Sequence, residues 1–93
     1  MASLSWPMNK TWSDEAWDDY LYWQDKDKKM VARINSLIKD IDRNGNAGIG
    51  KPEPLKHNLA GWWSRRIDKK NRLVYRITNA GIEISQCRTH YGQ

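Results

Sequence analysis

The sequence has few of the residues that crosslink a protein, bind a metal or anchor a chain in a membrane. It has a single cysteine, Cys87, so no intramolecular disulfide can form, and its two histidines are not spaced with cysteine as metal ligands are. No apolar run reaches the roughly 20 residues of a membrane helix, and residues 1–10 lack the features of a signal peptide. We therefore expect a cytoplasmic protein in a reducing compartment, with no membrane, metal or cofactor requirement.

Positive charge is concentrated in the second half of the chain. The 93 residues include 16 Lys and Arg against 11 Asp and Glu, a net charge of +5. Residues 1–43 hold seven basic and eight acidic side chains, whereas residues 44–93 hold nine basic and three acidic ones. A basic half of +6 that is rich in arginine is typical of a protein with a polyanionic partner. The alternative is a solvated basic face that serves solubility.

Hydrophobic spacing predicts two helices in the first half. Ser13 is a suitable N-cap, acidic residues follow it, and aromatic residues recur near helical spacing, so we expect a helix over residues 14–24. Asp27 can cap a second helix. The apolar stripe of that helix is Val31, Ile34, Leu37, Ile38 and Ile41. Residues 44–52 contain three Gly, two Asn and one Pro, which predicts a loop after this helical hairpin.

Alternating apolar and polar residues predict strands in the second half. Three of them are expected, at residues 63–67, 72–77 and 82–85, with turns at 68–71 and 79–81 that favour antiparallel hairpins. Further short strands are expected at residues 8–12 and near residues 55–59. The predicted fold class is α+β, with two N-terminal helices packed on one face of a twisted antiparallel β-sheet.

The basic half also contains groups that could perform acid–base chemistry on RNA, namely Glu53, His57, His90 and several arginines. Cleavage by the RNA's own 2′-hydroxyl needs a base, positive charge at the phosphate and an acid for the leaving 5′-oxygen, and it needs no metal. Histidine, with a pKa near neutral, is a suitable acid. A histidine so close to a chain end is alternatively an ordinary exposed residue.

Glu53 lies between Pro52 and Pro54, which keep the backbone extended and out of a helix. Its carboxylate is therefore held on a defined segment. The alternative is a surface carboxylate paired with Lys51 or Lys56.

Four side chains in or next to the predicted strands have two readings. Arg72 and Arg76 share strand parity, so at least one could face a phosphate, although both could be solvent-side residues of an amphipathic strand. Trp62 and Trp63 could stack on bases, but aromatic residues at strand spacing more often belong to the core, so we expect at least one to be buried.

The chain resembles a known family, the YoeB toxins of bacterial toxin–antitoxin pairs within the RelE-like superfamily. The resemblance extends over nearly all residues from Met8 onward and is carried by ordered blocks at the family's spacing. These blocks are residues 12–24 (WSDEAWDDYLYWQ), 50–59 (GKPEPLKHNL), 63–67 (WSRRI) with 72–75 (RLVY), and 87–91 (CRTHY). The resemblance implies a RelE-like domain over residues 8–93, preceded by an N-terminal extension at residues 1–7.

The same resemblance implies a ribosome-dependent mRNA endonuclease that cuts the codon in the A site. Residue by residue, it assigns Glu53 as the general base and Arg72 as the group that stabilises the transition state. It assigns His90 as the general acid and Tyr91 as the residue that orients the substrate. The basic residues that match RNA-contacting positions are Lys56, Arg65 and Arg66.

Members of this family form homodimers and are neutralised by a small antitoxin, so the resemblance implies a YefM-like partner and contact with operator DNA only through that complex. Two alternatives from the residues stay open. One is a non-cleaving module that binds the ribosome or the antitoxin and acts as a translation inhibitor or co-repressor. The other is a ribonuclease that does not need the ribosome.

Overall fold

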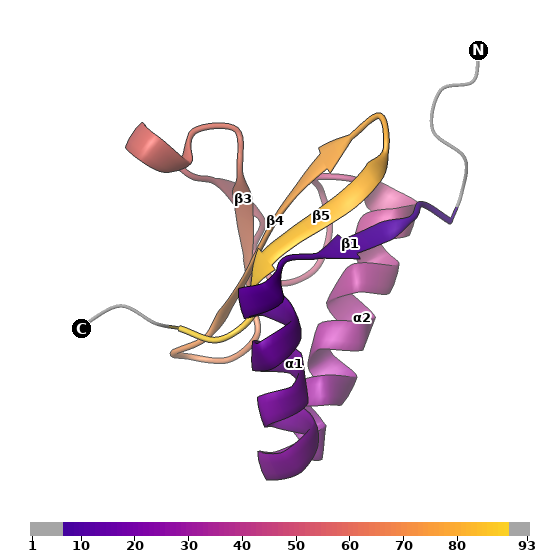
Figure 1. Cartoon of the computed structure of the whole chain (residues 1–93). Helices are drawn as coiled ribbons and strands as arrows, with labels where there is room; N and C mark the ends of the chain where they lie inside the picture. The colour runs from indigo at the N-terminus through magenta and orange to yellow at the C-terminus, as the bar shows by residue number, and fades with distance from the viewer. Residues whose placement is uncertain (1–6, 90–93) are drawn as a thin grey trace.

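A computed structural model describes residues 7–89 of the chain and contains two helices and a five-stranded sheet. In Figure 1, the two helices run alongside each other and α2 packs behind the sheet. Along the chain the elements are β1 (Lys10–Trp12), α1 (Asp14–Lys26), α2 (Lys28–Asn44), β2 (Glu53–Pro54), the short 3-10 helix η1 (His57–Leu59), β3 (Trp63–Arg66), β4 (Arg72–Thr78) and β5 (Gly81–Gln86). The α+β class is confirmed.

Both helices begin at the residues that the sequence indicated. The Ser13 hydroxyl accepts a hydrogen bond from the amide of Ala16, and the Asp27 carboxylate accepts one from the amide of Lys29. Asp27 is extended, so it ends α1 and caps α2, and the hairpin needs no longer connection. The second helix ends where Gly45 adopts a positive φ of 63°, which confirms the predicted loop.

The sheet has the strand order β1-β5-β4-β3-β2 and is mixed. Strands β2 to β5 pair antiparallel, as expected, but β1 pairs parallel to β5, with Lys10 opposite Ile82. The expectation of a wholly antiparallel sheet was therefore wrong at this edge. A parallel pair needs a long connection between its strands, and the two helices with the rest of the sheet supply it.

The remaining strand of the sheet is β2, at Glu53–Pro54. The expectation of a strand near residues 55–59 was wrong. Residues 57–59 instead form η1, which His57 enters with a positive φ of 60°. That left-handed conformation ends the extended segment directly after the pairing of β2 with β3.

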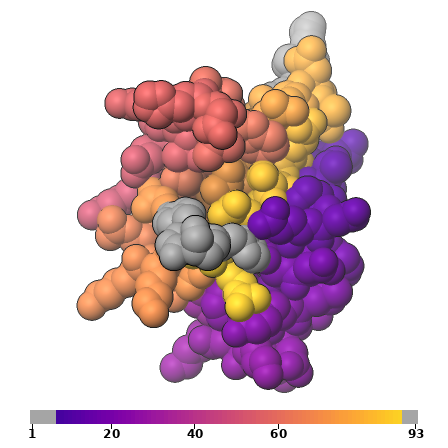
Figure 2. Space-filling view, turned by 60° about the vertical axis from the view of Figure 1, so that its left-hand side comes forward, coloured from indigo at the N-terminus to yellow at the C-terminus, as the bar shows by residue number. Residues whose placement is uncertain are grey.

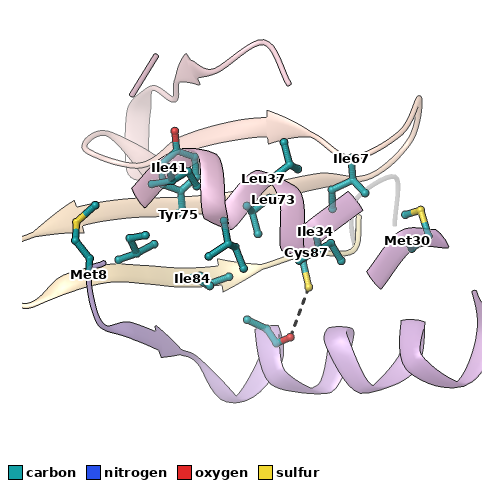
Figure 3. Close-up of a cluster of buried hydrophobic side chains, with 13 residues drawn as sticks. Met8, Met30, Ile34, Leu37, Ile41, Ile67, Leu73, Tyr75, Ile84 and Cys87 are labelled. Carbon is teal, nitrogen blue, oxygen red and sulfur yellow. Dashed lines mark hydrogen bonds between the residues drawn. The ribbon is translucent and has the colours of Figure 1, made fainter. Parts of the chain in front are cut away.

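The core lies between α2 and the sheet (Figure 3). Its best-buried side chains include Ile34, Leu37 and Ile41 of α2 and Leu73 and Tyr75 of β4, all with no exposed surface. Burial of each such side chain contributes about 1.5–3 kcal/mol relative to leaving it exposed. The predicted apolar stripe is thus confirmed, except that its first member, Val31, is only partly buried. Within residues 7–89, neither helix is long and apolar enough to cross a membrane.

Candidate functional site

A carboxylate and a guanidinium meet on the face of the sheet opposite the core. One guanidinium nitrogen of Arg72, Nη2, donates to Oε1 of Glu53 at 2.9 Å, and Nε of Arg72 donates to the hydroxyl of Ser64, also at 2.9 Å. The Glu53 side chain is 61% exposed and the Arg72 side chain 23% exposed, so a ligand could reach both. Within residues 7–89, Glu53 forms its ion pair with Arg72 and not with Lys51 or Lys56.

The pairing of three strands sets this geometry. Glu53 lies opposite Ser64 in the pairing of β2 with β3, and Arg66 lies opposite Arg72 in the pairing of β3 with β4. Because Leu73 points into the core, strand alternation sends Arg72 to the opposite face. Beyond each end of β2, a backbone hydrogen bond ties the chain to the β3 segment: the amide of Arg66 donates to the carbonyl of Gly50 at 2.7 Å, and the amide of Leu55 donates to the carbonyl of Trp62 at 2.9 Å.

Arg65, expected to contact RNA, is a buried part of the fold. Its side chain has no exposed surface, and all five of its N–H donors are used inside the protein. They bind the Tyr75 hydroxyl, the Asp40 carboxylate at 2.6 Å, and the carbonyls of Gly45, Ala47 and Ile49. A buried arginine whose donors are all occupied cannot reach a ligand, so Arg65 is no longer a candidate for contacting RNA.

The buried guanidinium closes the loop that leads to Glu53. Its hydrogen bond, more than any other contact, lowers the pKa of Asp40 below the ordinary value, although partial burial of the carboxyl opposes this. Gly50 sits where a Cβ would lie 2.7 Å from Cδ2 of Leu37 and 3.2 Å from Cβ of Arg65. The loop therefore packs tightly against the arginine just before the β2 strand begins.

The other two basic candidates are on the surface. Lys56 is exposed at the start of η1, and Arg66 is exposed at the end of β3, next to Arg72 in the sheet. His57 is exposed as well. The space-filling view in Figure 2 shows the segment around η1 projecting at the upper left and the β3–β4 turn at the lower left of one face.

Trp62 and Trp63 are both partly buried, and neither is fully buried. Trp63 is half-buried and packs against the core cluster. Trp62 lies under Arg76, whose guanidinium carbon is 4.4 Å from the ring centroid, while Nε of Arg76 donates to Glu83 at 2.7 Å. The expectation that at least one would be buried was thus wrong, since Trp63 only borders the core.

His90 and Tyr91 lie outside the described residues. The described chain ends at Thr89, whose amide donates to the side chain of Asn71 at 2.9 Å and whose hydroxyl donates to the carbonyl of Lys70. Asn71 immediately precedes Arg72 and is itself held by Asp68, which accepts its amide at 2.7 Å. The end of the described chain is thus fastened to the turn that leads into the Arg72 strand.

Helix α1 holds the same C-terminal segment from the other side. The amide of Cys87 donates to the buried carboxylate of Asp19 at 3.0 Å, and the indole N–H of Trp23 donates to the carbonyl of Cys87 at 2.9 Å. The guanidinium of Arg88 lies 3.6 Å from the ring centroid of Tyr22. Sequence reasoning did not find Asn71 or Asp19, because neither has a helix or strand pattern that marks a contact so distant in the chain.

Residues 7–89 contain no group of three or more His, Cys, Asp or Glu residues placed to hold a metal ion. What the site offers is a carboxylate as proton acceptor and a guanidinium as a donor to anions.

Comparison with known proteins gives consistent matches over most of the chain. The profile of the YoeB-like toxins of bacterial type II toxin–antitoxin systems matches residues 12–91. Toxin YoeB of Escherichia coli K12 is 58% identical over 84 residues, which cover 90% of this chain and all of that protein, and Toxin YoeB of Streptomyces coelicolor is 50% identical over 84 residues, with the same coverage of both chains.

Solved structures agree in fold. A YoeB–YefM complex from Staphylococcus aureus matches with a TM-score of 0.86 at 53% identity, and a YoeB dimer from the same organism with 0.85 at 54%, each covering 90% of this chain and 98% of the other. YafQ of E. coli matches with a TM-score of 0.70, covering 91% of this chain and 96% of YafQ, at 16% identity, which shows a shared fold alone.

Proposed function

The chain belongs to the YoeB-like toxins of bacterial type II toxin–antitoxin systems, and on that premise we propose that it is an endoribonuclease that cleaves mRNA in the ribosomal A site. One observation carries the proposal. Glu53 and Arg72, from neighbouring parts of one sheet face, meet at 2.9 Å where a ligand can reach both. These two groups are the base and the cation that transfer of a phosphoryl group to a 2′-hydroxyl requires.

In the proposed reaction, Glu53 takes the proton of the 2′-hydroxyl as that oxygen attacks phosphorus. Arg72 donates to the non-bridging oxygens, whose negative charge grows in the transition state. The bond from phosphorus to the 5′-oxygen breaks, and His90 protonates this leaving oxygen while Tyr91 orients the substrate. The products are a 2′,3′-cyclic phosphate and a free 5′-hydroxyl. His90 and Tyr91 enter the proposal from the sequence.

In the free protein, Arg72 is paired with Glu53, so the incoming phosphate must share this guanidinium with the carboxylate. Once Glu53 has taken a proton it is neutral, and its hold on Arg72 weakens. The Arg72 guanidinium is then free to interact with the phosphate oxygens at the stage when negative charge develops on them. The exposed side chains of Lys56 and Arg66 add salt-dependent attraction to RNA.

We extend the proposal to partners. Relatives have been solved as YoeB–YefM complexes and as a YoeB dimer. We propose that this chain likewise forms a homodimer and is neutralised by a YefM-like antitoxin, with operator DNA contacted only through that complex and with the ribosome and mRNA as its targets. In this proposal the toxin domain spans residues 8–93 and residues 1–7 are an extension.

The test compares two carboxylates that make the same kind of ion pair. Glu53 on β2 pairs with Arg72 on β4, and Glu83 on β5 pairs with Arg76 on β4 at 2.7 Å. Each is changed to Gln in the full chain, expressed without antitoxin, and mRNA ends are mapped by primer extension on translating ribosomes. Wild type and Glu83→Gln should cut at the A site, whereas Glu53→Gln should not.

Three outcomes contradict the proposal in different ways. Ends that are absent with wild type, despite arrested growth, indicate a module that binds without cleaving. Equal cleavage of naked RNA and of ribosomal mRNA indicates a nuclease that does not need the ribosome. Unchanged cleavage by Glu53→Gln removes Glu53 from the chemistry.

A further inference from the structure

Ser64 is a polar residue placed where a strand usually carries an apolar one. It is 1% exposed, in the middle of β3, with Glu53 opposite on one side and Val74 opposite on the other. Burying a hydroxyl costs free energy unless it is hydrogen-bonded. Its partner is Nε of Arg72, at 2.9 Å. The buried Ser64 hydroxyl therefore accepts a hydrogen bond from the Arg72 guanidinium of the candidate site.

This contact divides the donors of Arg72 in a particular way. Nε is held by Ser64 and Nη2 by Glu53, while Nη1 makes no hydrogen bond within residues 7–89. A guanidinium is planar, so two contacts at different nitrogens fix its plane and the directions of its remaining N–H groups. A long arginine side chain otherwise spreads over many rotamers, and holding it in one of them costs conformational entropy.

The two contacts differ in how they respond to the reaction. Glu53 is largely exposed, and in the proposed mechanism it becomes neutral when it accepts the 2′-proton. Ser64 is buried and has no charge to lose. Its hydrogen bond therefore persists at the stage when the contact with Glu53 weakens and Arg72 must face the phosphorus.

We propose that Ser64 is the positioning residue of Arg72, holding the guanidinium in place while Glu53 changes its protonation state. The role rests on the proposed nuclease function. It extends the candidate site to a third residue, in the block of residues 63–67, that acts through Arg72 and touches no substrate.

The test measures single-turnover cleavage by the full chain on programmed ribosomes, over a range of ribosome concentrations. Ser64→Ala should lower the maximal rate about tenfold, as the loss of one positioning hydrogen bond predicts, with the half-saturating concentration unchanged. Ser64→Thr, which keeps the hydroxyl, should restore most of the rate. Ser36→Ala, an exposed serine on α2, is the matched control and should cleave like wild type.

A second arm asks whether the effect passes through Arg72. In an Arg72→Lys background the Nε donor is gone, so Ser64→Ala should cause no further loss of rate. In the NMR spectrum of the Nε–H groups, the Arg72 signal should shift and exchange faster with water in Ser64→Ala, while the Arg76 signal stays unchanged. Thermal melting checks folding, and Ser64→Cys replaces Ser64→Ala if the latter does not fold.

The outcomes separate this inference from the function on which it rests. A wild type that leaves no ends on ribosomes overturns the proposed function and the role of Ser64 with it. A wild type that cleaves, with Ser64→Ala equally fast, overturns the role of Ser64 alone. A loss of rate that persists in full in the Arg72→Lys background overturns it too.

Discussion

Replacing Arg65 by methionine should cost the fold more than almost any other change to a charged residue. The substitution keeps much of the side-chain volume but removes all five hydrogen bonds. It leaves the Tyr75 hydroxyl, the Asp40 carboxylate and three backbone carbonyls without this partner. Removing one member of a buried ion pair costs about 3–5 kcal/mol, chiefly because the remaining charge is left without compensation.

The position of Asp40 keeps the loss inside this range. Its side chain is 17% exposed and retains hydrogen bonds from Asn44 and the amide of Ile49, so water and these donors offset part of the loss. A domain of this length is stable by roughly 5–14 kcal/mol, so the variant loses a large share of its stability. At about 4–8 °C per kcal/mol, the melting temperature should fall by roughly 12–40 °C.

Arg66→Met is the matched control, since it is the same change one residue along the same strand at an exposed position. Its effect should stay within about 0.5 kcal/mol. The assay is urea unfolding of both variants and wild type, followed by far-UV circular dichroism and tryptophan fluorescence. A loss below about 1 kcal/mol for Arg65→Met, or equal losses in the two variants, would refute the reasoning.

Acidity provides a second reading of the same pair. Arg65 lowers the pKa of Asp40 in the folded state below its unfolded value. The stability from this pair is therefore fully present above the unfolded pKa and is lost as pH falls through the folded one. Urea midpoints measured between pH 7 and pH 2 should fall less steeply below about pH 4 in Arg65→Met than in wild type. Equal slopes would contradict this assignment of the pKa shift.

Three further predictions test other parts of the fold. Gly50→Ala places a Cβ at a φ of +80° and 2.7 Å from Cδ2 of Leu37, so thermal unfolding should show a loss of about 1–3 kcal/mol. Asn71→Ala removes the acceptor of the Thr89 amide, so hydrogen exchange at that amide should become faster while exchange in the helices stays unchanged. Burial, with a smaller contribution from Asp19, raises the pKa of Cys87 to about 12, so at pH 8 the thiol should react with a disulfide reagent in urea but not in the native protein.

Local sequence signals predicted most of the elements, because local physics determines them. The caps at Ser13 and Asp27 and the alternation after residue 62 depend on neighbouring residues, and the structure confirms them. The direction of β1 does not depend on its neighbours. The direction depends on the path of the chain through the two helices and the other strands before it reaches β5. A stretch of a few residues carries no information about that path.

The candidate site was predictable in its parts but not in its contacts. The position of Glu53 between two prolines indicated an extended segment, yet its pairing with Arg72 depends on a strand register that turns and loop lengths decide. The burial of Arg65 could have been predicted from the sequence, since Arg65 shares strand parity with Trp63 and Ile67 on the core side. Its positive charge outweighed that parity, because arginine is rarely buried unless fully paired.

The parallel edge of the sheet has a consequence for how the protein is made. Ser13 binds the carbonyl of Ser85, 72 residues later, and β1 has no partner until β5 exists. During synthesis the two helices can form early, but the sheet can be completed only after β5 (Gly81–Gln86) has left the ribosomal exit tunnel. A growing chain of this protein therefore lacks its finished sheet until β5 is available, and the groups on the sheet come together only after that strand has paired.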